Sequence, residues 1–115
     1  MGETIFSRII RKEIPADIIY ENEDVLAFRD IRPQAPVHVL IIPKLQIPKT
    51  TDINGRSHAA LLGKLIDAAN TIAKQEKVDE SGFRLVINCG PESGQEVYHL
   101  HIHLLGGRKM NWPPG

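Results

Sequence analysis

At residues 97–105 the chain reads VYHLHIHLL, with a histidine at positions 99, 101 and 103. Successive side chains of a β-strand point to opposite faces, so His99, His101 and His103 share one face if this stretch is extended. The apolar residues between them then share the other face. The pattern predicts a strand with one wall for chemistry and one wall in the hydrophobic core.

The residues alone leave three interpretations of this histidine row open. Imidazoles work near neutral pH as nucleophiles, as proton carriers or as donors to phosphate. They also bind zinc, although no neighbouring cysteine or acidic pattern completes a zinc site here. His38 could supply a further ligand, or could assist a nucleophile by hydrogen bonding. The third interpretation is a row of surface histidines, which is also our interpretation of His58.

The loop GPESGQE at residues 90–96 leads directly into the row. A glycine-containing loop can present backbone N–H groups to an anion, and the Gln95 side chain offers one more donor. The chain contains neither GxxxxGK[ST] nor GxGxxG, the common phosphate-binding loops. Phosphate recognition is therefore expected from this loop and the histidines together.

The remaining sequence predicts an α+β fold. Thr4 caps a short amphipathic helix that ends by Pro15, and one long helix covers roughly residues 57–75. The expected strands cover residues 18–20, 25–28, 37–42, 83–88 and 97–105. Strands outnumber long helices and do not alternate regularly with them, which indicates an antiparallel sheet of about five strands. The apolar run in the strand at 37–42 predicts a central position for it.

Composition limits the class of protein. The 115 residues suit one domain, with a C-terminal tail from about residue 107, and 14 basic side chains balance 14 acidic ones. This balance argues against binding to long nucleic acids or anionic membranes. A single cysteine, Cys89, excludes an internal disulfide. With no secretory pattern at the N-terminus and no apolar run beyond residues 39–42, we expect a cytoplasmic protein with a small anionic ligand.

The histidine row resembles the signature His-φ-His-φ-His-φ-φ of the histidine-triad (HIT) superfamily. Further matches, which together cover nearly the whole chain, are TIF at 4–6, IIRKEIP at 9–15, DI at 30–31, PQAP at 33–36, GQ at 94–95 and WPPG at 112–115. This combination is similar to the Hint branch, the purine nucleoside phosphoramidases. Two residues depart from the pattern. Glu96 stands where many members carry Ser or Thr, and Ser93 stands where a second Gly is common. We expect Glu96 to offer its backbone N–H while its side chain turns away from the phosphate.

The resemblance implies a HIT-like fold and a homodimer that hydrolyses purine nucleoside 5′-phosphoramidates through a nucleotidyl-histidine intermediate. It implies no metal and no other cofactor. His101 would attack the α-phosphorus, and His99 would orient it. His103 and His38 would handle protons and phosphate oxygens.

The resemblance also places residues in substrate binding. These are Asn88, Gly94, Gln95 and Glu96 at the phosphate, Asp30 at the ribose, Ile5, Phe6, Phe28, Ile31 and Leu40 around the base and sugar, and Trp112 near the partner's site. By residue type alone, Asp30 would equally suit a turn, and the two phenylalanines would suit the core.

A second function of a different class is a nucleotide-binding regulatory protein that acts through its partners. Within the superfamily, nucleotidyltransferases carry Gln at the last motif position, so His103 argues against them. Dinucleoside polyphosphate hydrolases are a further rival, disfavoured by the Hint-like ends of the chain. A lysine adduct of AMP made by a tRNA synthetase is one candidate substrate.

Overall fold

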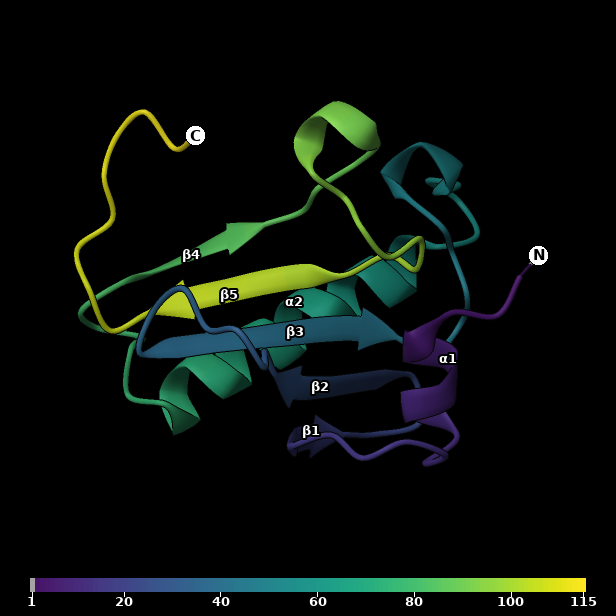
Figure 1. The fold of residues 1–115 in the computed structure, drawn as a ribbon, viewed down its shortest axis with the longest axis horizontal. Helices are drawn as coiled ribbons and strands as arrows, with labels where there is room; N and C mark the ends of the chain where they lie inside the picture. The colour runs from purple at the N-terminus through teal and green to yellow at the C-terminus, as the bar shows by residue number, and fades with distance from the viewer. Residues whose placement is uncertain (1) are drawn as a thin grey trace.

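The structure is a computed structural model that describes residues 2–115. Its elements, in chain order, are α1 (Ile5–Ile10), β1 (Ile18–Glu21), β2 (Val25–Arg29), β3 (Val37–Pro43), the 3-10 turn η1 (Thr50–Asp52), α2 (Ala59–Gln75), β4 (Phe83–Val86), the 3-10 turn η2 (Pro91–Ser93) and β5 (Ile102–Gly106). The strands form one sheet in the order β1-β2-β3-β5-β4, and every neighbouring pair is antiparallel (Figure 1). The predicted fold class and the central place of the third strand are confirmed.

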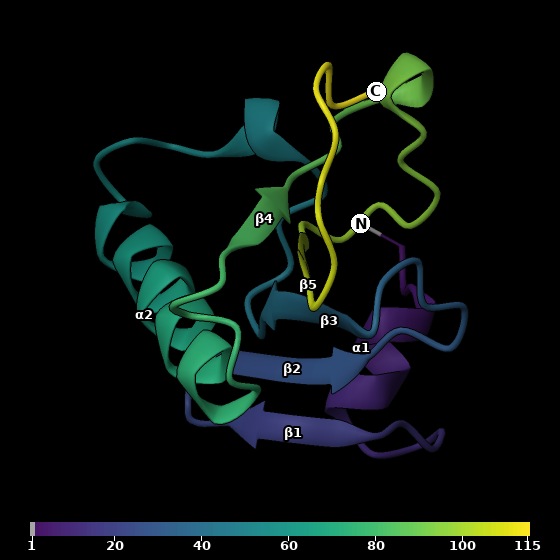
Figure 2. The ribbon, with the colours of Figure 1, turned by 90° about the vertical axis from the view of Figure 1, so that its left-hand side faces the viewer.

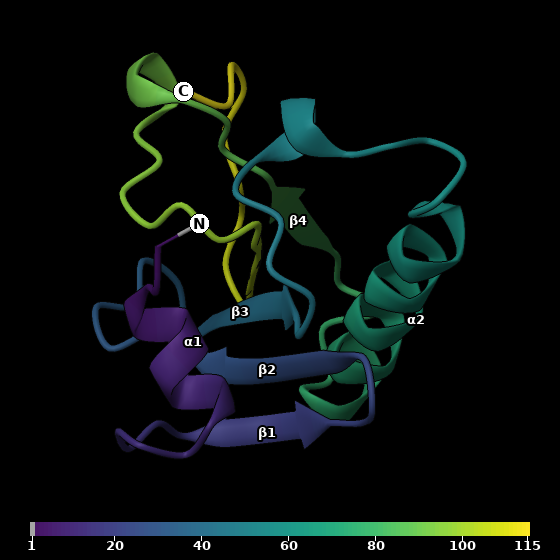
Figure 3. The ribbon, with the colours of Figure 1, turned by 90° about the vertical axis from the view of Figure 1, so that its right-hand side faces the viewer.

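The two helices cover opposite faces of the sheet, α2 on one side and α1 on the other (Figures 2 and 3). On the α2 side, fully buried Leu65 and Ile72 pack with Val39 and Ile41 of the central strand. On the α1 side, Phe6 lies in a second, smaller core. Among residues 2–115, no helix is long and apolar enough to cross a membrane.

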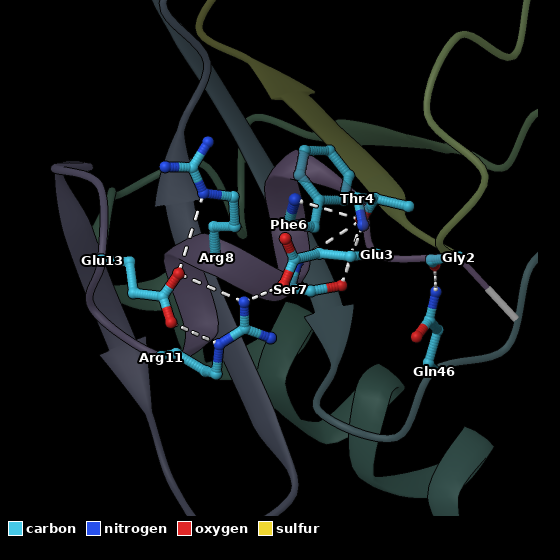
Figure 4. Close-up of polar contacts among 9 residues, drawn as sticks. All are labelled: Gly2, Glu3, Thr4, Phe6, Ser7, Arg8, Arg11, Glu13 and Gln46. Carbon is cyan, nitrogen blue, oxygen red and sulfur yellow. Dashed lines mark hydrogen bonds and ion pairs between the residues drawn. The ribbon is translucent and has the colours of Figure 1, made fainter.

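The start of α1 is fixed by a capping box. The Thr4 hydroxyl accepts from the backbone of Ser7, and the Ser7 hydroxyl accepts from the backbone N–H of Thr4 (Figure 4). Arg11, just beyond the helix, pairs with Glu3 and Glu13 (Figure 4). The contacts of Thr4 and Ser7 satisfy free N–H groups at the start of the helix.

The short helix ends at Ile10, five residues before the predicted stop at Pro15. Lys12 turns the chain with a positive φ of 62°, and the N–H of Glu13 bonds back to the carbonyl of Arg8. The long helix begins at Ala59, two residues after its predicted start. The fourth strand ends at Val86, two residues before its predicted end.

The histidine strand is shorter than predicted. Ladder pairing with β3 begins only at Ile102, which lies opposite Ile41, although β3 itself continues to Pro43 in its pairing with β2. Upstream, the N–H of Leu100 bonds instead to the carbonyl of Ile47 in the following loop. The residues 97–101 therefore run along the end of β3 without belonging to a regular strand.

The turn after β5 holds the loop that precedes β3. Gly107 has a φ of 87°, and a Cβ at this position would stand 2.9 Å from the Pro36 side chain. Only glycine suits both conditions. The next residue, Arg108, donates from Nε to the carbonyl of Gln34 at 3.0 Å. Residues 33–36 are thereby fixed beside the histidine row.

Candidate active site

The three histidines of the row lie on the α1 face of the sheet. The Phe6 ring meets His101 edge-on at a centroid distance of 5.1 Å and His99 at 6.0 Å. The rings of His101 and His103 are 5.0 Å apart. The intervening residues lie in the core beneath α2: Leu100, Ile102 and Leu104. The prediction of one chemical wall and one core wall is confirmed, although two of the histidines precede the strand.

His101 is held in one defined tautomer. Its Nδ1 lies 2.7 Å from the backbone carbonyl oxygen of His99. A carbonyl only accepts, so Nδ1 must carry the proton, and in the neutral ring the lone pair is then on Nε2. The side chain is only 7% exposed. Its one open nitrogen is therefore nucleophilic without prior loss of a proton.

His99 is the most deeply buried histidine of the row. Its Nε2 donates to the carbonyl of Pro43 at 2.7 Å, and its side chain is 1% exposed. Among residues 2–115, no group contacts its Nδ1. The ring fastens the row to the end of β3, and the backbone carbonyl of His99 accepts from Nδ1 of His101.

A second pair of histidines, His38 and His103, forms between the neighbouring strands β3 and β5. Nε2 of His38 lies 3.0 Å from Nδ1 of His103, and the other ring nitrogen of His38 accepts from the backbone N–H of Gln34 at 3.0 Å. Asp30 places one carboxylate oxygen 3.5 Å from the same Nε2, while its other oxygen accepts from the N–H of Arg32. Asp30 thus shapes a turn and also faces the histidines.

Burial disfavours the charged form of all four histidines. It lowers the pKa of His38, His99 and His101 below the ordinary value of 6.5, and in His38 the nearby Asp30 offsets the effect only in part. Burial and the like charges of His101 and His38 lower the pKa of His103 to about 4. The contact between His38 and Asp30 is therefore not an ion pair at neutral pH.

These pKa values predict a loss of stability in mild acid. An unfolded histidine takes up its proton near pH 6.5, whereas folded His103 does so only near pH 4, so protons favour unfolding inside that window. Protonation of His103 should leave the free energy of unfolding unchanged above pH 6.5 and should lower it as the pH drops toward 4. Urea denaturation across this range measures the slope. The variant His103→Asn should show a shallower slope, and an unchanged slope would contradict this assignment.

The loop before the row is internally braced by Gln95. The side-chain oxygen of this buried residue accepts from the N–H of Gly90, and its nitrogen donates to the carbonyls of Pro48 and Val97. The Gln95 amide is therefore engaged within the loop, contrary to the expectation that it donates to phosphate. Gly94 lies in the left-handed region with a φ of 87°. The backbone N–H groups of Gly90, Gly94 and Gln95 are likewise bonded within the loop, so an anion would have to bind through the loop's other N–H groups.

The other expected binding residues divide by exposure. Phe6, Phe28 and Leu40 are buried in the smaller core, as their residue type predicts. Ile5 is about half exposed, Ile31 is 93% exposed and Trp112 is 82% exposed. The side chain of Glu96 is exposed and Asn88 is half-buried. The structure thus brings the four histidines and Asp30 together and leaves Ile5, Ile31 and Trp112 exposed.

Two backbone groups that form hydrogen bonds with the histidines were not predicted from the sequence. They are the backbone N–H of Gln34, which bonds to His38, and the backbone carbonyl of Pro43, which holds His99. Every residue carries such groups, so no side-chain pattern reveals them. The only sequence signal is indirect, namely the proline-flanked loop at residues 33–36 just before His38.

Several known proteins are similar to this chain. The family model "HIT domain" matches residues 11–110. A purine nucleoside phosphoramidase of Escherichia coli (strain K12) is 55% identical over 108 residues, which span 94% of this chain and 90% of the relative. A "14 kDa zinc-binding protein" of Brassica juncea is 55% identical over 114 residues, covering 98% and 100%. The crystal structure of a HIT family hydrolase from Legionella pneumophila superposes with a TM-score of 0.95 at 50% identity, covering 98% and 100%.

The name of the Brassica relative raises the question whether a metal fits here. Asp30, His38 and His103 each offer a ligand atom, and these atoms lie within 4.8 Å of one another. The donor types suit zinc. The facing nitrogens of His38 and His103, however, are already hydrogen-bonded to each other. A metal would have to break that bond and displace a proton, so the cluster as built does not fit a resident metal ion.

Proposed function

This chain belongs to the HIT domain family, in its Hint branch, and from that premise we propose that His101 cleaves the phosphorus–nitrogen bond of a nucleotide substrate by covalent catalysis. The chain is a hydrolase of the purine nucleoside phosphoramidase kind. The observation that carries the role of His101 is its hydrogen bond to the carbonyl of His99, which leaves the Nε2 lone pair open.

The reaction proceeds as two displacements. First, Nε2 of His101 bonds to the α-phosphorus while the P–N bond breaks, and the departing amine nitrogen takes one proton from the solvent. Second, water attacks phosphorus and returns one proton to the solvent. His101 then leaves as a neutral imidazole, because its Nδ1 has kept its proton on the carbonyl of His99 throughout. The two steps therefore consume only water.

Neighbouring groups bind the substrate around this nucleophile. His103 lies next to His101 and contacts phosphoryl oxygens or the leaving nitrogen. The loop that contains η2 supplies backbone N–H groups to the phosphate, that of Glu96 among them, together with Asn88. Asp30 accepts from the ribose hydroxyls with the carboxylate oxygen that faces His38. Phe6 and the exposed Ile31 line the base and sugar side.

The second subunit of a homodimer covers the apolar surfaces left open. Ile66 of α2 and Ile87, just after the edge strand β4, are 44% and 45% exposed. Trp112 on the C-terminal tail is 82% exposed, which is a large apolar area for a side chain in water. The partner's site is the place we propose for this tail. Sedimentation velocity checks the assembly.

Cytoplasmic placement and a tRNA synthetase as the source of substrate stay predictions.

The test of the function is turnover of an adenosine or guanosine 5′-phosphoramidate by the purified protein. We expect the nucleoside 5′-monophosphate and the free amine in equal amounts, with a rate that a chelator leaves unchanged. Chromatography of both products measures the reaction. A protein that binds the nucleotide but releases no amine would overturn the proposal and favour a regulatory binding role.

A further inference from the structure

The hydrogen bond between His38 and His103 could run in either direction, and the positions of the two rings alone do not decide which nitrogen donates. Nε2 of His38 and Nδ1 of His103 are 3.0 Å apart, and either nitrogen could be the donor. The choice matters for the reaction, because it decides what His103 presents at its other nitrogen. A neutral histidine that accepts at Nδ1 carries its proton on Nε2, and one that donates from Nδ1 has a lone pair there.

The backbone of the preceding loop settles the choice. The N–H of Gln34 points at Nδ1 of His38 at 3.0 Å, and an amide N–H only donates. Nδ1 of His38 must therefore be an acceptor, so the proton of the neutral ring is on Nε2. That N–H donates to Nδ1 of His103, which in turn places the His103 proton on Nε2. One amide thus fixes both rings.

We propose that the backbone N–H of Gln34 is a positioning group that keeps His103 as an uncharged hydrogen-bond donor toward the reacting phosphoryl group and keeps the neighbouring cluster closed to metal ions. This inference rests on the proposed function for the direction of the His103 donor. The closure to metal follows from the hydrogen bonds alone. As long as Nδ1 of His38 accepts from the N–H of Gln34, the ring proton is on Nε2, and Nε2 then has no lone pair for a metal ion.

The surroundings of Gln34 support a positioning role for this amide. The loop cannot relax easily, since Arg108 holds the carbonyl of Gln34 at 3.0 Å and Gly107 packs against Pro36. The Gln34 side chain is exposed and donates to the nearby carbonyl of Arg32, away from the histidines. Burial of His38 and His103, which disfavours a second proton on either ring, agrees with a pair that is held neutral.

The first test is the tautomer of each histidine in the wild-type protein, read from ¹⁵N NMR of histidine-labelled samples at neutral pH. We expect His38 and His103 protonated at Nε2, and His101 protonated at Nδ1. A His38 protonated at Nδ1 would overturn the proposal, whatever the activity of the enzyme. This measurement needs no variant, so it stands even if a loop substitution fails to fold. It is also independent of whether the substrate is a phosphoramidate.

The second test removes the donor. Gln34→Pro lacks the backbone N–H, and the matched variant Gln34→Ala keeps it while losing the side chain. In Gln34→Pro, His38 is free to carry its proton on Nδ1, and the cluster of Asp30, His38 and His103 should bind zinc at least about tenfold more tightly than wild type in calorimetric titration. Gln34→Ala should keep both the wild-type tautomers and the wild-type zinc affinity. Equal zinc affinity in folded Gln34→Pro and Gln34→Ala, or a wild-type tautomer in Gln34→Pro, would overturn the proposal.

Discussion

Replacing His101 with Asn is expected to lower kcat for a purine nucleoside 5′-phosphoramidate by about ten-thousand-fold, the scale on which enzymes lose activity with their nucleophile. Asn preserves a side-chain donor near the carbonyl of His99 but offers no lone pair that can bond to phosphorus. Steady-state kinetics measures the loss, and calorimetry with the nucleoside monophosphate should show that binding survives.

The matched control is His58→Asn, which makes the same change at a histidine near the start of α2. His58 accepts from the backbone of Asn54 and belongs to no part of the site. Its variant should keep kcat within about twofold of wild type, as substitutions away from a site generally do. Turnover by His101→Asn that stays within tenfold of wild type would contradict the nucleophilic role.

Leu104→Ala is expected to lower the free energy of unfolding by about 3 kcal/mol, because it leaves a cavity in a closely packed core. Leu104 is fully buried and lies between the sheet and α2. Urea denaturation followed by circular dichroism measures the change.

The neighbouring Leu105→Ala serves as its control, since Leu105 points to the other face of the sheet and is only half-buried. Its loss of stability should be clearly smaller, because less apolar area returns to water. Equal losses for the two variants would contradict the division of this strand into a core wall and a chemical wall.

The core wall and the chemical wall could be predicted because alternation is a property of the residues themselves. The three histidines at 99, 101 and 103 share a face in the structure, and the leucines and isoleucine between them share the other. The positions of the five strands and of the long helix along the chain followed from equally local patterns. The central position of residues 37–42 followed from their lack of polar alternation.

The extent of the histidine strand could not be predicted, because it depends on a partner distant in sequence. Pairing with β3 stops at Ile41, before that strand ends, and the N–H of Leu100 bonds to the loop carbonyl of Ile47. Nothing in the sequence of residues 97–101 distinguishes a ladder partner from a loop partner. The same limit applies to Gln95, whose amide could have served a phosphate but is engaged with Gly90, Pro48 and Val97.

The chemistry of the site was predictable only down to residue type. The sequence indicates which histidines take part, but protonation is set by three backbone groups: the carbonyls of His99 and Pro43 and the N–H of Gln34. Every residue has these groups, so only their positions in space give them a role. The same three groups separate a nucleophile with neutral neighbours from a zinc site made of the same side chains.

The measurement that tests the central claim most directly is the position of the covalent intermediate. Enzyme in excess over a purine nucleoside 5′-phosphoramidate is quenched in alkali, which preserves phosphohistidine, and its peptides are mapped by mass spectrometry. We predict one added nucleoside monophosphate group, bonded to His101 and absent from His101→Asn. A nucleotide adduct on another residue, or turnover with no adduct at any time, would contradict the assignment of His101 as the nucleophile.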